Sequence, residues 1–401
     1  MNRPVGYPFE VHPVFDGPNL VDLARVMSRE VGSSVIFPES KEQDRIKKSV
    51  GDPEKILLIL MDGLGSHFLT SPDAPPFLSE AMDMTINTVF PSTTASALTT
   101  LSTGLWPSQH GALGWWTYMK EINGPVTTLP FTRMLDGISL GEVGVNGENL
   151  FSAETFLRTS DREISGLLPS DIYASTFSDY ALGGNLVHKY SGMEEGFRSA
   201  TNLLKSKEGP DFLYFYVPDV DSNAHRYGID HNFTKAAVTE ADRLCGVLRD
   251  ELGGSNIRVI ITADHGHLEA NESEKIAINE KVLRAGLIQQ PISGDARVSY
   301  MRLDQESADV THADLVAFFG DEFQLITNQE AITWQLFGPT INEVSKDRLG
   351  DLIAISKGNS VACWSEEGQS GSMLDLKSFH SGLTKTEMEI PLIIFCLKFQ
   401  V

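Results

Sequence analysis

Residues 55–65 read KILLILMDGLG, an apolar run that ends in an acid and two glycines. A continuous apolar run of this length, without polar alternation, is typical of a strand buried on both faces of a sheet. Three further runs have the same character: Phe212–Val217 (FLYFYV), 257–263 (IRVIITA) and 391–397 (PLIIFCL). We therefore expect these four runs to be strands of one central sheet.

Segments with helical periodicity lie between these strands. Residues 94–102 and 233–252 carry apolar side chains at the three- and four-residue spacing of an amphipathic helix. Strand and helix patterns that alternate along a chain favour the α/β class. We expect a mostly parallel central sheet that is flanked by helices on both faces.

The region 270–369 has a different pattern. We expect an α/β core of residues 1–269 plus 370–401 and a smaller α+β insertion of residues 270–369 that helps to wall the site. Its short strand-like runs are residues 296–303, 323–326 and 352–355. Its one helix-like stretch is residues 311–319.

The composition excludes several classes of protein. The chain has 401 residues, 41% of them apolar, and its formal net charge is 32 − 54 = −22. The apolar content excludes a disordered chain, a coiled coil and a collagen-like fibre. The negative charge opposes binding to DNA or RNA, so no nucleic-acid polymer is expected as a partner. A small phosphate ester would need local positive charge, which bound metal ions supply even in an acidic protein.

The cysteine pattern indicates a reducing compartment. Cys245, Cys363 and Cys396 are odd in number and widely spaced, which argues against a disulfide framework. The first residues show no signal-peptide pattern, and no apolar run is long enough to span a membrane. We expect a cytoplasmic protein without a membrane partner. The sequence leaves a homo-oligomer open.

Acidic and histidine residues cluster just after the predicted strands. The carboxyl ends of parallel strands meet at one edge of a sheet, where ligands bind. Carboxylate oxygens and imidazole nitrogens are ligands for zinc and similar divalent ions. Singly, such an acid is usually a helix cap and such a histidine a surface or core residue. Together they predict a metal site, and its candidate residues are Asp62, Asp221, His225, Asp264, His265 and His380.

Two of the spacings explain how these side chains can converge. Asp221 and His225 are four residues apart, which places both on one face of a helical turn. Gly266 follows Asp264 and His265 directly and permits a sharp turn. Three other polar residues are not counted as metal ligands. We expect Asp219, His267 and His110 to have structural roles or to support the ligands from behind.

The stretch TVFPSTTASALTTLSTGLWPSQHG, residues 88–111, supplies candidate nucleophiles. Its small residues after Pro91 predict a helix, with Thr93 and Thr94 in the first turn. Unpaired N–H groups and the positive end of the helix dipole favour an anion there. A threonine hydroxyl becomes a nucleophile once a metal or base activates it. Helix capping is the alternative role, and the residues alone leave the two threonines undistinguished.

Five motifs in order resemble the alkaline phosphatase superfamily, and most closely its nucleotide pyrophosphatase/phosphodiesterase branch. They lie within residues 56–395 and read MDGLG, FPSTTASALTTLSTGLWPSQHG, DSNAHRYG, TADHG and FHSGLTKTEMEIP. Single motifs such as TADHG are weakly specific, whereas all five in this order are strong evidence.

The resemblance implies a phosphoric ester hydrolase with two zinc ions per chain and a covalent phosphoenzyme. One ion would be held by Asp221, His225 and His380. The other would be held by Asp62, Asp264, His265 and the nucleophile oxygen. The superfamily places its nucleophile nine residues before a Thr-Gly pair, here Thr103-Gly104, and 103 − 94 = 9 selects Thr94. Manganese or another divalent ion is the alternative to zinc.

One departure from the branch concerns the substrate. Trp115 stands where phosphodiesterases of this branch often have an asparagine that donates to a phosphoryl oxygen. An indole can donate one hydrogen bond or form an apolar wall. An apolar wall favours a small phosphodiester as the substrate. A monoester carries more charge and would call for a cation such as Arg133 or Lys120.

Five other functions remain as alternatives. A phosphomonoesterase or a phosphomutase of the same superfamily would share the ligands. A sulfatase would need a cysteine at position 94, which is threonine. A serine hydrolase would use Ser139 in the G-x-S-x-G match of residues 137–141, although no clear strand precedes it. A metal-binding scaffold would not require a hydroxyl at residue 94.

Overall fold

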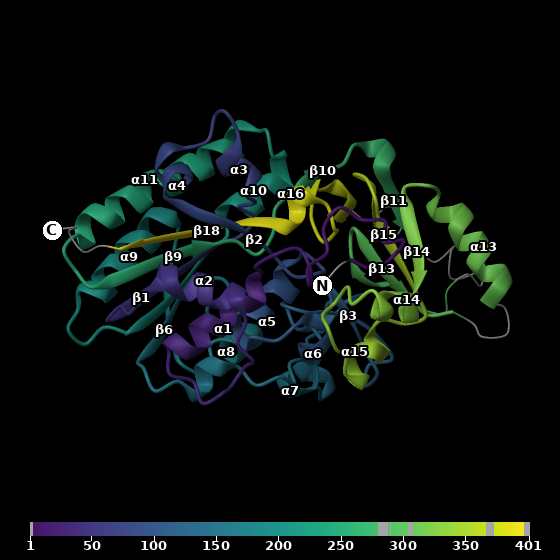
Figure 1. Ribbon diagram of the computed structural model, residues 1–401. Helices are drawn as coiled ribbons and strands as arrows, with labels where there is room; N and C mark the ends of the chain where they lie inside the picture. Colours follow the sequence, from purple (N-terminus) through teal and green to yellow (C-terminus); the bar gives the residue numbers. More distant parts are fainter. Residues whose placement is uncertain (1–2, 280–287, 289, 304–307, 366–372, 397–401) are drawn as a thin grey trace.

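A seven-stranded sheet forms the centre of the computed structural model, which describes residues 3–279, 288, 290–303, 308–365 and 373–396 (Figure 1). Its strand order is β2-β18-β9-β1-β8-β6-β7. The five strands from β9 to β7 are parallel, and β18 runs antiparallel to both of its neighbours. The predicted α/β class with a mostly parallel sheet is therefore confirmed.

The four predicted strands are all present in this sheet. They are β1 (Lys55–Met61), β8 (Phe212–Val217), β9 (Ile257–Thr262) and β18 (Glu389–Cys396), and residue 397 lies outside the described residues. Three strands were not predicted: β2 (Met82–Asn87), β6 (Ile164–Pro169) and β7 (Leu186–Tyr190). Their sequences MDMTIN, ISGLLP and LVHKY are short and mix polar with apolar residues, so they lack a continuous apolar run.

Helices cover both faces of the central sheet (Figure 1). On one face α9 (Met193–Lys205) packs against β6, β7 and β8 and contacts α11 (Asn232–Leu252), which also contacts α4 (Pro76–Ala81). On the other face α1 (Leu20–Glu30) contacts α2 (Lys41–Val50) and α5 (Thr94–Thr103). Helix α5 in turn contacts α8 (Thr176–Ala181). The expected helices at 94–102 and 233–252 thus correspond to α5 and α11.

A second seven-stranded sheet lies beside the first (Figure 1). It is antiparallel throughout. Its order is β14 (Phe323–Thr327), β15 (Leu352–Ser356), β13 (Val298–Met301), β12 (Ser293–Asp295), β3 (Trp116–Met119), β4 (Gly124–Thr127) and β5 (Thr132–Arg133). The predicted division at 270–369 stays a prediction. The structure adds that β3–β5 join this sheet through the pairing of Gly294 with Trp116.

Shorter elements complete the described chain. Strand β10 (Leu268–Glu269) pairs with β17 (Ser378–Phe379), and β11 (Lys275–Ile278) pairs with β16 (Val361–Trp364). No helix among the described residues is long and apolar enough to cross a membrane. The remaining helices are α3 (His67–Thr70), α6 (Pro107–His110), α7 (Gly147–Leu150), α10 (Asp219–Tyr227), α13 (Ala308–Phe319), α14 (Asn328–Thr333), α15 (Glu343–Arg348) and α16 (Lys385–Met388), with 3₁₀ turns at Leu140–Val143, Phe156–Thr159, Glu272–Glu274 and Met373–Asp375.

Candidate active site

Three parallel neighbours, β1, β8 and β9, deliver most of the predicted site residues to one edge of the central sheet. Asp62 follows β1 directly, and its backbone carbonyl accepts a hydrogen bond of 3.1 Å from the Asp221 N–H. Asp221 and His225 lie on α10, which begins just after β8. Asp264 and His265 follow β9. The shared edge is therefore a consequence of strand order, since the carboxyl ends of adjacent parallel strands coincide.

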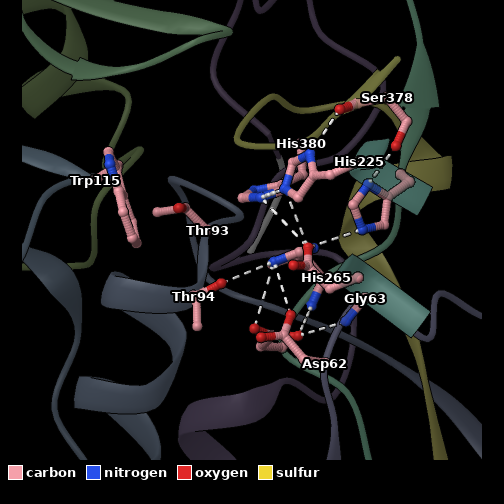
Figure 2. A network of polar contacts seen from close by, with 12 residues as sticks. Asp62, Gly63, Thr93, Thr94, Trp115, His225, His265, Ser378 and His380 are labelled. Carbon is pink, nitrogen blue, oxygen red and sulfur yellow. Dashed lines mark hydrogen bonds and ion pairs between the residues drawn. The ribbon is translucent and has the colours of Figure 1, made fainter. Parts of the chain in front are cut away.

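His380 reaches the same place by another route. It follows β17, whose pairing with β10 brings the segment beside the chain that leaves β9. The Nδ1 atom of His380 lies 3.1 Å from the Ser92 carbonyl oxygen, and that of His225 lies 2.7 Å from the Ser378 carbonyl oxygen. These backbone contacts leave the Nε2 atom of each ring facing the cluster (Figure 2).

The first group of candidate ligands comprises Asp62, Asp264 and His265. The Nε2 atom of His265 lies 3.4 Å from Asp62 Oδ1 and 3.4 Å from Asp264 Oδ2. The other Asp264 oxygen accepts hydrogen bonds from the N–H groups of Gly63 and His265, both at 3.0 Å. Tyr216 donates its hydroxyl to Asp62 Oδ2. One oxygen of each carboxylate is thus anchored, and the other faces the centre of the group.

The second group gathers around Asp221 and includes a residue that sequence reasoning left outside. The Nε2 atoms of His225 and His267 lie 3.2 Å and 3.1 Å from Asp221 Oδ1, and that of His380 lies at 3.9 Å. Ser378 Oγ lies 3.1 Å from His267 Nδ1. The sequence feature that could have predicted this role of His267 is its two-residue spacing from His265 in DHGH. In an extended segment this spacing places both rings on the same side.

Glycine at position 63 is required by this crowding. Gly63 has φ +75°, in the left-handed region, and an added Cβ would lie 2.6 Å from His267 Nε2 and 2.9 Å from the Asp221 Cα. No other residue type can occupy the position without moving the cluster.

Four polar atoms at the centre of the cluster fit bound cations. They are buried, and within the part of the chain that the structure describes their only polar neighbours are other side chains of the cluster: Asp62 Oδ1, Asp221 Oδ1, Asp264 Oδ2 and His267 Nε2. Leaving such groups unpaired costs free energy, about 1–3 kcal/mol each and more when charged. A divalent cation satisfies them, and the mixture of carboxylate oxygen and imidazole nitrogen matches the ligand types of zinc. The residues present therefore fit a divalent metal centre.

The electrostatics favour the neutral form of three of the four imidazoles, whereas the pKa of His225 is raised because the negative charge of Asp221 outweighs the effect of burial. Burial, reinforced by neighbouring histidines, lowers the pKa of His380 to about 3 and holds the pKa of His265 well below its usual range. Burial likewise lowers the pKa of His267 to about 4. Burial raises the pKa of Asp264 to about 6, and burial with repulsion from Asp264 raises the pKa of Asp62 well above its usual range. Two adjacent buried carboxylates thus repel each other until positive charge is placed between them.

The two candidate threonines are separated by their contacts. Thr93 Oγ1 donates a hydrogen bond of 2.7 Å to Asp295 Oδ2. Thr94 is the first residue of α5, and its Oγ1 lies 3.2 Å from His265 Nε2 (Figure 2). Thr94 therefore presents its hydroxyl to the first ligand group, whereas Thr93 is engaged away from it.

Trp115 lies across from the threonines (Figure 2). Its backbone N–H donates to Asp295 Oδ2 at 3.1 Å, and its side chain lines a cavity of about 500 Å³ together with Asp62, Thr94 and Asp221. Arg133 pairs with Asp136 at 2.9 Å, and neither Arg133 nor Lys120 is among the described residues that line the cavity.

Three further residues lie apart from both ligand groups. His110 Nε2 lies 3.0 Å from Thr100 Oγ1, and its Nδ1 accepts from the Ala112 N–H at 3.1 Å, so both ring nitrogens are engaged outside the ligand groups. Asp219 is the first residue of α10. Ser139 precedes a 3₁₀ turn and does not line the cavity among the described residues.

Comparison with known proteins identifies relatives. The family model described as type I phosphodiesterase / nucleotide pyrophosphatase matches residues 56–380. Human ectonucleotide pyrophosphatase/phosphodiesterase family member 1 is 25% identical over 242 residues, which are 56% of this chain and 24% of that protein. Xenopus laevis bis(5'-adenosyl)-triphosphatase enpp4 is 24% identical over 249 residues, 56% of this chain and 50% of its own. The chain thus spans between a quarter and a half of these curated relatives.

Solved structures show the same fold. Murine ectonucleotide pyrophosphatase/phosphodiesterase 5 superposes with a TM-score of 0.62 at 16% identity, covering 84% of this chain and 87% of that chain. Phosphonoacetate hydrolase from Sinorhizobium meliloti 1021, in complex with phosphonoacetate, gives a TM-score of 0.60 at 17% identity and covers 85% and 90%.

Proposed function

The chain belongs to the type I phosphodiesterase / nucleotide pyrophosphatase family, and we propose that it hydrolyses small phosphodiesters through a covalent phosphothreonine at Thr94. The observation that carries the proposal is the position of Thr94 Oγ1, 3.2 Å from His265 Nε2. It lies beside the cluster in which Asp62 Oδ1 and Asp264 Oδ2 are buried without a hydrogen-bond donor among the described residues outside the cluster.

Two zinc ions complete the proposed site. Asp221, His225 and His380 hold one of them, and the position of His267 Nε2, 3.1 Å from Asp221 Oδ1, supports the addition of His267 to this set. Asp62, Asp264, His265 and the Thr94 oxygen hold the other. When bound, such ions lower the pKa of a hydroxyl and neutralise the charge on phosphoryl oxygens.

The residues of the chain then perform a two-step displacement. Thr94 Oγ attacks phosphorus, so that the Oγ–P bond forms while the P–O bond to the leaving oxygen breaks, and the proton released from the Thr94 hydroxyl balances the one that the leaving oxygen takes up to depart as the alcohol. Water then attacks the phosphothreonine, so that a new O–P bond forms and the Oγ–P bond breaks; one proton of the water goes to Thr94 Oγ, and the phosphate monoester is released. The positive end of the α5 dipole favours the anionic phosphoryl group at this position.

A diester is favoured over a monoester by the surroundings of Thr94. None of the described residues that line the adjoining cavity is Lys or Arg, and Trp115 contributes an apolar wall. A monoester would bring a further negative charge without a protein cation to meet it. A phosphomonoesterase or a phosphomutase is the alternative that substrate kinetics must separate.

Kinetics with aryl esters test this function. We expect kcat/KM for bis(p-nitrophenyl) phosphate to exceed the values for p-nitrophenyl phosphate and p-nitrophenyl sulfate. Metal analysis of the same sample should find two zinc ions per chain, and exhaustive chelation should abolish hydrolysis. Full activity after chelation would remove the proposal.

Matched threonine variants test the nucleophile. Thr94→Ala should lower kcat by about 10³-fold or more, because the covalent route is lost. Thr93→Ala should lower kcat far less, since the Thr93 hydroxyl contacts Asp295 and not the ligand groups. In this variant Asp295 still accepts the hydrogen bond from the Trp115 N–H. Equal losses in the two variants would contradict the assignment.

A further inference from the structure

The cavity beside Thr94 extends away from the ligand cluster, between the central sheet and the helices that cover it. Its volume is about 500 Å³, within the range of pockets that bury a whole small molecule. Asp62, Thr94 and Asp221 contribute to its lining, which continues between the sheet and two helices. The helical part of the wall comes from α5 and α8, and the sheet part from β1, β6 and β8.

The strand positions set the depth of the cavity. Leu58 on β1 and Asp62 just after its end both line the cavity, and their four-residue spacing places both side chains on one face of the extended chain. Four residues of strand span about 13 Å at about 3.3 Å per residue. On β8 the residues Phe212, Tyr214 and Tyr216 line the cavity in the same way, with Tyr214 paired to Leu58. The cavity therefore runs along the strands, away from the cluster.

Most hydroxyl groups in the wall already have protein partners. Ser102 Oγ donates to the Leu98 carbonyl oxygen at 2.8 Å, and Ser178 Oγ donates to the Ile172 carbonyl oxygen at 2.8 Å. Tyr216 donates to Asp62. What these side chains leave for a ligand is chiefly apolar surface.

The remaining wall is aliphatic and aromatic. Its apolar residues come from both the sheet and the helices, and among those described are Leu98, Leu101, Phe156, Leu168, Phe177 and Leu182. The described lining holds no Lys or Arg, and its charged residues are all aspartates: Asp62, Asp171 and Asp221. A further phosphate of a nucleotide would meet no protein cation there, and a nucleobase would find few free polar partners.

From this wall we infer that the cavity binds an uncharged apolar chain, alkyl or acyl, esterified to the phosphate. The inference rests on the proposed function and specifies its substrate class: a phosphodiester that bears one long apolar group. Burial of apolar surface provides the binding free energy, while the phosphate stays beside Thr94 at the metal cluster.

Calorimetry with n-alkyl phosphates tests this substrate class. These compounds carry one chain each, and the zinc-loaded protein would be titrated with the ethyl, butyl, hexyl, octyl and decyl members. Kd should fall about threefold to fourfold for each added methylene until the chain fills the cavity. AMP should bind at least tenfold more weakly than octyl phosphate. A Kd that is independent of chain length, or AMP binding more tightly than octyl phosphate, would overturn the inference.

A filling variant and a matched control locate the chain. Ala181 on α8 lines the cavity, so Ala181→Phe should flatten the dependence of Kd on chain length. Ala236 is exposed on α11 and does not line the cavity, so Ala236→Phe should keep the original dependence. Identical dependence in both variants would place the chain elsewhere and refute the inference.

The unaltered protein decides the question even where Ala181→Phe does not fold, because its alkyl phosphate series needs no variant. Hydrolysis of bis(p-nitrophenyl) phosphate by the same sample separates the two proposals. If hydrolysis is present and chain dependence is absent, only the apolar-chain inference fails. If chain dependence is present and hydrolysis is absent, the proposed function fails.

Discussion

Breaking the buried ion pair of Arg297 and Glu387 should be among the most damaging single changes in this protein. Both side chains are fully buried, and Arg297 Nε lies 2.6 Å from Glu387 Oε1. Arg297 follows β12, whereas Glu387 lies on α16 in the segment that carries His380. The pair therefore ties the second sheet to the loop that delivers a candidate metal ligand.

The other partners of the pair set the size of the effect. Arg297 also donates from Nη2 to the Gly358 carbonyl oxygen at 2.6 Å and from Nη1 to the Ser360 carbonyl oxygen at 3.2 Å. Glu387 Oε1 accepts the Gly382 N–H at 2.7 Å. Removing the carboxylate leaves a buried guanidinium without its counter-charge, which costs about 3–5 kcal/mol. Glu387→Ala should lower the free energy of unfolding by that amount and reduce zinc content by displacing His380.

Urea unfolding at fixed zinc concentration measures this loss. The control is Glu251→Ala, because Glu251 pairs with Lys205 at 2.9 Å on the surface with both side chains about half exposed. Removal of such a pair should change stability by less than about 1 kcal/mol.

A double variant checks the physical reason. Arg297→Met with Glu387→Leu removes both charges, so it should be less destabilised than Glu387→Ala. A loss from Glu387→Ala no larger than that from Glu251→Ala would refute the reasoning. The single variants Arg297→Met and Glu387→Leu would be measured as well. A double variant whose loss in the free energy of unfolding equals the sum of these two single losses would also refute the reasoning.

Three further predictions concern the cluster and its surroundings. His267→Ala should weaken zinc binding, measured by competition with a chromogenic chelator, whereas Asp219→Asn should not; equal affinities would exclude His267 from the site. Tyr216→Phe should weaken zinc binding by about tenfold or more, because Asp62 loses the hydroxyl that orients it; unchanged affinity would show that the contact does not orient the carboxylate. Burial lowers the pKa of His110 to about 3, so the unfolded chain binds a proton below about pH 6.5 that the folded protein does not. Its contribution to stability is present above pH 6.5 and is lost as the pH falls, by about 1.4 kcal/mol per unit of pH. Urea unfolding of the chelated protein at pH 7 and pH 5 should show a smaller difference for His110→Gln than for the original chain; the same difference in both would contradict this.

Local pattern was enough to predict the centre of the fold. The runs at β1, β8 and β9 are continuous and apolar because strands in the middle of a parallel sheet are buried on both faces. The acids and histidines that follow them were expected at one sheet edge, and the structure brings these residues together. The cytoplasmic location and the identity of the metal stay predictions.

Tertiary contacts supplied what local pattern does not encode. Strands β6 and β7 belong to the sheet through their partners, although their own sequences are short and mixed. The pairing of Gly294 with Trp116 joins segments far apart in the chain, so the periodicity of neither segment predicts it.

The same limit applies to the site. Thr93 and Thr94 are neighbours of one residue type, and it is contact with Asp295 or with His265 that separates them. His267 joins the cluster because the β10–β17 pairing folds its segment toward Asp221. Periodicity in a sequence reports which side of an element is buried, whereas the partner that buries it, and any cavity left between the two, depends on distant segments that meet when the chain folds.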